Sequence, residues 1–174
     1  TSYTYNGAKQ VLTISHNWAS KGLTPVQLLT YVYNADGSVY SLTWASGGTT
    51  VASWTYGYDL AGRLSSVTNS FGETTSYTYD GEGKLLTQTN GNNTSTSYTY
   101  SQARGWQTQL AEAYSGTNFA TYDLVYDGGN NTVGNLTGGT EIDGRTVSYN
   151  YEWLYRLTNE ERTGTREYKK GDKY

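Results

Sequence analysis

A tyrosine pair that recurs at nearly constant spacing is the feature that most restricts the fold of this chain. The motif Tyr-x-Tyr, usually followed by Asp or Asn, begins units near residues 3, 31, 56, 77, 98, 124 and 149, with Leu for the first tyrosine in the sixth unit. The second tyrosines at 5, 33, 58, 79, 100, 126 and 151 are therefore 28, 25, 21, 21, 26 and 25 residues apart. Such a period is typical of proteins built from stacked copies of one small unit. We expect residues 1–174 to form one repeat array.

The unit that begins at residue 77 shows how one repeat can fold. Tyr77 and Tyr79 are separated by one residue, so both rings lie on the same face of an extended strand. Asp80 can accept hydrogen bonds from the amides that follow it, and either of the next two glycines can take a positive φ, so a tight turn is predicted. Residues 84–90 then form the returning strand and residues 90–93 the next turn. One repeat is predicted to be one β-hairpin.

About seven hairpins in series predict an all-β fold, an antiparallel spiral or meander in a curved single sheet. The composition supports an ordered chain, because 19 Tyr and 5 Trp are far more aromatic side chains than disordered segments carry. Aligned tyrosines should stack across neighbouring hairpins, and their hydroxyls can reach water or a backbone group. The terminal strands should expose edges that pair with further repeats of a parent chain, another protein chain or a second copy.

Charge and composition argue against several classes of partner and site. The formal net charge of −3 gives no broad positive field, so we expect no nucleic-acid partner, and residues 162–174 form only a mixed-charge tail. The absence of cysteine removes disulfides, thiolate metal sites and thiol catalysis. No apolar run approaches the length of a membrane span, so no membrane insertion is expected.

No arrangement of residues predicts an enzyme. His16 is the single histidine, and strand alternation favours a position on the sheet surface over a catalytic one. Asp59, Asp80 and Asp127 could ligate calcium, but each lacks the further acidic ligands that a calcium loop gathers. We interpret these three residues as turn caps and expect no catalytic residue, cofactor or metal.

The repeat resembles the unit of the Rhs, or YD-repeat, family, which reads approximately Tyr-x-Tyr-Asp-x-x-Gly-Arg-Leu. Residues 56–64 match every fixed position, residues 77–85 differ only by Lys for Arg, and residues 149–160 resemble a variant unit. The resemblance extends over nearly the whole chain. The structural repeat residues that carry it are Tyr56, Tyr58, Asp59, Gly62, Arg63, Leu64, Tyr77, Tyr79, Asp80, Gly83, Lys84 and Leu85.

This resemblance implies a segment of a larger secreted or surface protein, in which a strip of repeats spirals into a hollow β-shell. In bacterial toxin complexes and polymorphic toxins such a shell encloses a toxic cargo, and in teneurins a similar shell supports adhesion. We therefore expect a structural segment of a shell or fibre, serving encapsulation or adhesion without catalysis.

A carbohydrate-binding module is the alternative function, because exposed Tyr and Trp rings among Asn, Gln and Thr can stack on sugars and hydrogen-bond to them. Trp44, Trp54, Trp106 and Trp153 are the candidates. A binding site is expected where the repeat is broken, and residues 105–107 break it most clearly. Trp106 is therefore the predicted glycan contact.

Overall fold

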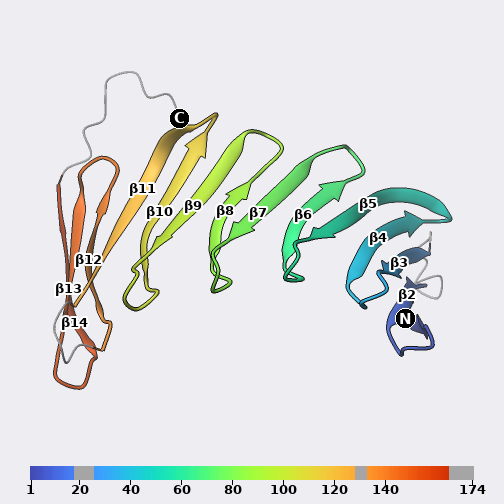
Figure 1. Ribbon diagram of the computed structural model, residues 1–174, viewed down its shortest axis with the longest axis horizontal. Helices are drawn as coiled ribbons and strands as arrows, with labels where there is room; N and C mark the ends of the chain where they lie inside the picture. Colours follow the sequence, from blue (N-terminus) through green and yellow to red (C-terminus); the bar gives the residue numbers. More distant parts are fainter. Residues whose placement is uncertain (18–25, 128–132, 165–174) are drawn as a thin grey trace. The chain divides into compact units, whose positions relative to one another are not determined.

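The computed structural model describes residues 1–17, 26–127 and 133–164, so most of the mixed-charge tail lies outside the described residues. The strands follow one another in the sheet in the order of the sequence, β1 to β14, and Figure 1 shows them as successive hairpins. The described part contains no helix that could span a membrane. The prediction of an all-β, antiparallel fold built from hairpins is confirmed. The strands are β1 (Ser2–Tyr5), β2 (Val11–His16), β3 (Gln27–Tyr33), β4 (Val39–Ser46), β5 (Thr49–Tyr58), β6 (Leu64–Asn69), β7 (Thr74–Tyr79), β8 (Leu85–Thr89), β9 (Thr94–Tyr100), β10 (Gln107–Tyr114), β11 (Thr117–Tyr126), β12 (Leu136–Glu141), β13 (Thr146–Tyr151) and β14 (Leu157–Thr163).

The chain divides into two compact units. The first comprises residues 1–83 and 89–92, and the second comprises residues 84–88 and 93–174. In the first unit each strand from β1 to β7 pairs antiparallel with the next. In the second unit the same holds from β9 to β14. That residues 1–174 form one repeat array stays a prediction.

Where the pairing of a tyrosine strand with its return strand is described, a β-bulge lies at the second tyrosine. In the first unit Tyr58 pairs with Leu64, and the register shifts by one residue between Gly57 and Tyr58. A bulge of this kind bends the strand and interrupts the hydrogen-bond ladder locally. The same shift occurs beside the second tyrosine of other repeats, namely Tyr5, Tyr33, Tyr126 and Tyr151.

The turn after the bulge at Tyr58 has the geometry that its sequence predicts. The Asp59 amide donates to the Arg63 carbonyl oxygen at 2.8 Å, and the Gly62 amide donates to the Asp59 carbonyl oxygen at 2.9 Å. Gly62 has a φ of 77°, in the left-handed region that a residue without a Cβ adopts at low cost. Where the repeat has lost this glycine, Lys9 and Tyr155 occupy the same position with φ values of 64° and 62°.

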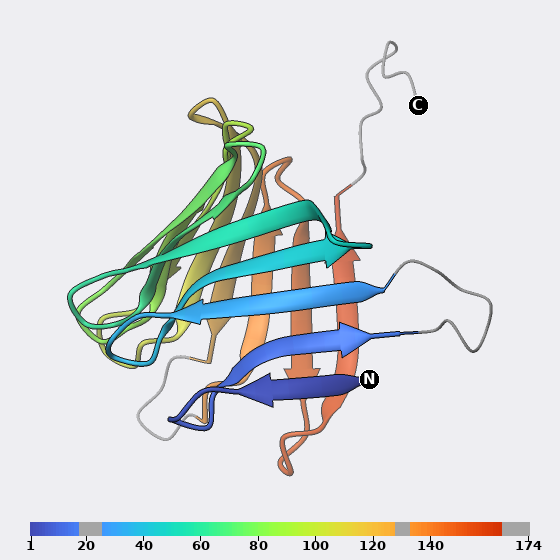
Figure 2. The ribbon, with the colours of Figure 1, turned by 90° about the vertical axis from the view of Figure 1, so that its right-hand side faces the viewer.

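The strands of each unit form one layer, and no large side chain of the described residues is fully buried. The buried apolar residues of the described part are Ala52, Ala111 and Ala113. Figure 2 shows β1 to β5 of the first unit side by side as such a layer. Alternation gives the layer two chemically different faces. One face carries the tyrosine pairs with Trp44 and Trp54, whereas the other is rich in Ser and Thr, as in the consecutive pairs of Thr13 with Thr30 and of Thr30 with Thr43.

Candidate functional site: the clasp between hairpins

The second tyrosine of a repeat ties its hairpin to the one before it. The Tyr79 hydroxyl donates a hydrogen bond to the Leu64 carbonyl oxygen, 2.8 Å away, at the start of the preceding return strand. This bond recurs in other repeats. Ring stacking was predicted between neighbouring hairpins, but Tyr31 and Tyr33, whose ring centroids are 6.5 Å apart, stack within one strand. A buried or half-buried tyrosine hydroxyl needs such a partner, which explains why the motif uses Tyr and not Phe. The equivalent bonds join Tyr33 to Val11 (2.7 Å), Tyr58 to Val39 (2.9 Å), Tyr100 to Leu85 (2.9 Å) and Tyr151 to Leu136 (2.8 Å).

Arg63 completes this connection in the first unit. Its Nε donates to Asp59 Oδ2 at 2.7 Å, and its Nη1 donates to the carbonyl oxygen of Asp80 in the next hairpin, also at 2.7 Å. Its Cζ lies 4.7 Å from the centroid of the Tyr79 ring, a cation–π arrangement. The planar guanidinium can make these three contacts at once. We call Asp59, Arg63, Leu64, Tyr79 and Asp80 the clasp.

The turn keeps Asp59 ionised. The Arg63 amide donates to its Oδ1 at 2.9 Å, and this bond is the largest of the causes that lower the pKa of Asp59 below its ordinary value. The Arg63 side chain and the Ala61 amide act in the same direction. Because Arg63 is about one-third exposed, the ion pair itself adds little stability, and its main effect is to aim the guanidinium at the next hairpin.

The aspartates predicted to cap turns make the corresponding hydrogen bonds. Asp80 Oδ1 accepts from the Glu82 amide at 2.9 Å, and Asp127 Oδ1 accepts from the Gly134 amide at 3.0 Å. Within the described part of the chain, no group of three or more His, Cys, Asp or Glu side chains is placed to hold a metal ion. The carboxylates therefore act on the backbone of their own turns.

Lys84 takes the position of Arg63 in the second unit. Its Nζ lies 5.6 Å from the centroid of the Tyr100 ring, while the Tyr100 hydroxyl bonds the Leu85 carbonyl oxygen. A Cβ on Gly105 would lie 2.7 Å from Lys84 Cε, so the glycine leaves room for the lysine stem. A single-point cation thus replaces the fork of the arginine.

Trp106 lies where the repeat pattern is broken and packs within the second unit. Its ring centroid lies 5.1 Å from that of Tyr126, and the Arg104 guanidinium carbon lies 4.8 Å from the indole. A Cβ on Gly134 would lie 2.4 Å from Trp106 Cζ2. The indole is thus used for contacts between neighbouring strands. Its predicted role in binding a glycan stays a prediction.

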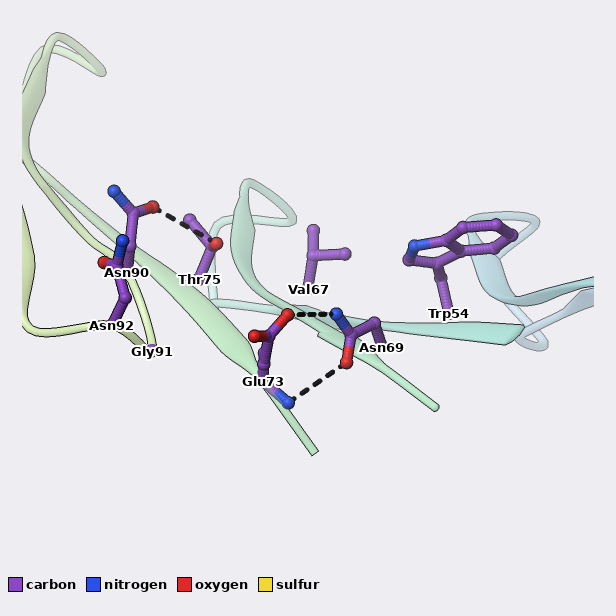
Figure 3. A pocket seen from close by; sticks show the side chains of 8 residues that line it. All are labelled: Trp54, Val67, Asn69, Glu73, Thr75, Asn90, Gly91 and Asn92. Atoms are coloured by element: carbon purple, nitrogen blue, oxygen red, sulfur yellow. Dashed lines mark hydrogen bonds between the residues drawn. The ribbon is translucent and has the colours of Figure 1, made fainter. Parts of the chain in front are cut away.

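A second candidate site lies on the tyrosine face of the first unit, at the strand ends far from the clasp. The sequence named Trp44 and Trp54 as candidates but did not predict that they share one site. Trp54, on β5, borders a hollow of about 260 Å³ that is also lined by Asn69, Glu73, Thr75 and residues 90–92. Figure 3 shows the Trp54 indole at one end of this hollow and the Asn90 amide at the other. The lining is polar apart from the indole and Val67.

Trp54 also borders an apolar hollow on its other side. This hollow has a volume of about 310 Å³ and brings Trp54 together with Trp44, Leu29 and Leu42. His16 lines its rim, and Nδ1 of this histidine lies 2.8 Å from Thr1 Oγ1. Two of the four candidate tryptophans therefore share one site, whereas Trp153 is 80% exposed at a turn. Strand pairing brings Trp44 and Trp54 together, and a search of the sequence for breaks in the motif cannot detect this proximity.

Comparisons with known proteins agree with the repeat geometry. Residues 58–93 match the RHS Repeat family model. The crystal structure of TcdB2-TccC3-Cdc42 aligns with a TM-score of 0.70 at 20% identity, over 88% of this chain and 9% of that chain. TcdB2-TccC3-TEV aligns with a TM-score of 0.71 at 18% identity, and TcdB2-TccC3 without its hypervariable C-terminal region aligns at 0.70 and 19%, each over 88% of this chain and 8% of the other. No curated protein matches. The chain therefore spans less than a tenth of the length of these solved chains.

Proposed function

Given that the chain carries an RHS repeat at residues 58–93 and has the fold of an Rhs-repeat shell, we propose that it forms part of a β-shell or fibre. In this role it belongs to a larger secreted or cell-surface protein and serves encapsulation or adhesion. It acts as a scaffold without catalysis. Its partners are further repeats of the parent chain, another protein chain or a second copy.

The recurrence of one contact between hairpins is the observation that supports this proposal. Five tyrosine hydroxyls bond the preceding hairpin in the same way, at distances of 2.7–2.9 Å. A repeat that is held by its neighbour does not need a core of its own, so the array can be extended without a change in its packing. This is the property that a wall of many repeats requires.

The turn before β14, the last described strand, carries half of a clasp, and no described residue supplies the other half. Arg156 corresponds to Arg63. Its side chain is 71% exposed, whereas that of Arg63 is 32% exposed because the guanidinium lies against the Tyr79 ring. Every residue of β14 is exposed. At the other end, Tyr5 is 58% exposed and corresponds to the tyrosine that completes a clasp. A strand carrying Tyr-x-Tyr is therefore the expected neighbour of β14.

Light scattering across a concentration series tests this role. We expect the mass of the isolated chain to increase with concentration, because the half-clasp of one copy can accept Tyr5 of another. Arg156→Ala should reduce this association severalfold. The control is Arg162→Ala, which removes a side chain of similar exposure, 67%, from β14 itself and outside the clasp.

A monomer at all concentrations would contradict association through open edges, and it would favour a self-contained binding module. Equal effects of Arg156→Ala and Arg162→Ala would show that association depends on charge and not on the clasp.

A further inference from the structure

The tyrosine face of the first unit departs from the repeat at Trp54. The position four residues before the second tyrosine is Trp in the third repeat and Thr, Leu, Tyr or Val in the other repeats. Strands β4 and β5 are also longer, with 8 and 10 residues against 6 and 5 in β7 and β8. The extra length adds the surface on which Trp44 lies. The residues at the corresponding positions are Thr1, Leu29, Trp54, Thr75, Thr96, Tyr122 and Val147.

The Trp44 indole is held in place at the edge of the apolar hollow. Its Nε1 donates to Gln27 Oε1 at 2.7 Å, and Gln27 Nε2 donates in turn to Ser46 Oγ at 2.8 Å. Trp44 pairs across the strands with the small Ala52 and remains 37% exposed. A fixed ring that is open to solvent gives a ligand a surface without a large cost in side-chain entropy.

The polar hollow on the other side of Trp54 has fixed hydrogen-bonding groups. Glu73 Oε2 accepts from Asn69 Nδ2 at 2.8 Å, and Asn69 Oδ1 accepts from the Glu73 amide at 3.0 Å. The Thr75 hydroxyl donates to Asn90 Oδ1 at 3.3 Å. A carboxylate accepts several hydrogen bonds, so Glu73 retains acceptor capacity beyond its bond to Asn69.

An apolar ring next to fixed amides and a carboxylate suits a particular ligand chemistry. A pyranose with equatorial substituents has flat C–H faces that can cover an indole, while its hydroxyls project in the plane of the ring toward polar groups. Among the described residues no Lys or Arg lines either hollow, and Glu73 contributes a negative charge, so the described lining disfavours an anionic sugar. Because Trp54 borders both hollows, one ligand can extend over both only if it has two or more rings.

We propose that the groove formed by the two hollows on either side of Trp54 binds a neutral oligosaccharide of flat, equatorially substituted pyranose rings. Trp54 is the central platform, Trp44 supports a neighbouring ring, and Glu73 with the amides of residues 69 and 90 contacts the hydroxyls. This inference goes beyond the structural role and does not depend on it. The site is a shallow surface, so binding should be weak and should come from contact with several rings.

Titration of the whole chain with cellohexaose and chitohexaose, followed by calorimetry and by NMR of side-chain amides, tests the inference. We expect saturable binding that shifts the amide signals of Gln27 and Asn69. Trp54→Ala should weaken binding at least tenfold, and Trp44→Ala severalfold. Trp153→Ala is the matched control, because it removes a tryptophan that is 80% exposed outside the groove, and it should bind as the parent does.

Two further measurements keep the test decisive if Trp54→Ala alters the sheet. Trp54→Phe retains a ring and should keep part of the affinity, and circular dichroism of every variant shows whether the sheet is intact. A folded Trp54→Ala chain that binds normally would overturn the inference, as would loss of binding in Trp106→Ala alone. Preference for a sulfated oligosaccharide, or no binding at millimolar sugar, would also overturn it. None of these outcomes would affect the association experiment on β14.

Discussion

The clasp around Tyr79 and the contact around Tyr126 achieve the same connection with different chemistry. At Tyr79, a hydroxyl-to-carbonyl bond and the Arg63 guanidinium join the hairpins. At Tyr126, the ring packs against the Trp106 indole, and the two ring centroids are 5.1 Å apart. The first connection is directional, because it consists of hydrogen bonds and a cation placed over the ring. The second is apolar and depends on Gly134, which lies 28 residues after Trp106 in the sequence.

The difference shows which part of the repeat is required and which part can change. Both connections retain an aromatic ring at the second tyrosine, Tyr79 or Tyr126. What covers the ring can be a cation or an indole, because both offer favourable contact with a π face. The indole is bulkier, so its use requires a space that only glycine provides at residue 134.

The largest effect that separates the two regions is expected from alanine at two glycines that have the same φ. Gly134 and Gly83 both have a φ of 91°. A Cβ on Gly134 would lie 2.4 Å from the Trp106 ring, whereas nothing lies within 4 Å of one on Gly83. Gly134→Ala should therefore lower the free energy of unfolding by about 3 kcal/mol and Gly83→Ala by about 1 kcal/mol. Urea denaturation measures both, and equal losses would mean that the indole moves aside freely.

The next effect concerns the group that covers the tyrosine ring. Trp106→Ala removes a half-buried indole from Tyr126 and should cost about 2 kcal/mol, below the value for a fully buried tryptophan. Arg63→Ala removes a partly exposed side chain and should cost about 1 kcal/mol. Thermal unfolding followed by circular dichroism compares them. A larger loss of stability for Arg63→Ala than for Trp106→Ala would show that the cation contributes more to its connection than the indole does.

A smaller effect is expected from removal of a single hydroxyl. Tyr79→Phe leaves the Leu64 carbonyl without this donor and should cost about 1 kcal/mol. Tyr126→Phe should cost less, because its described contact is made by the ring. Hydrogen exchange of the amides on the neighbouring strands reports each loss locally. Equal losses would indicate that the Tyr126 hydroxyl is bonded as firmly as that of Tyr79.

The smallest effect depends on pH. The pKa of Asp59 is lowered in the folded chain, chiefly by the Arg63 amide, so its ionised form stabilises the fold above the unfolded pKa of about 3.9. This contribution is lost as the pH falls through the folded pKa. Asp59→Asn keeps the turn-capping oxygen but not the charge, so its melting temperature should be below that of the parent at pH 6. The gap should close as the pH is lowered below 4, and a gap that widens would contradict this sign.

The sequence by itself determined the hairpin and its turn. Tyr77 and Tyr79 lie on one face because strand side chains alternate, and Asp59 with Gly62 specifies the turn because one accepts amide bonds and the other tolerates a positive φ. These are local properties of a few consecutive residues, so the repeat pattern displays them directly.

Only the tertiary structure decided how the repeats are joined and where a ligand could bind. The acceptor of the Tyr79 hydroxyl lies 15 residues earlier, and Trp44 meets Trp54 only through the register of β4 on β5. Trp106 breaks the pattern, and only the structure shows that its indole packs against Tyr126 and beside Gly134, while its role as a glycan contact stays a prediction. A departure from a repeat marks a local change in chemistry, but whether the changed side chain meets its own sheet or solvent depends on residues that pairing brings together from distant positions.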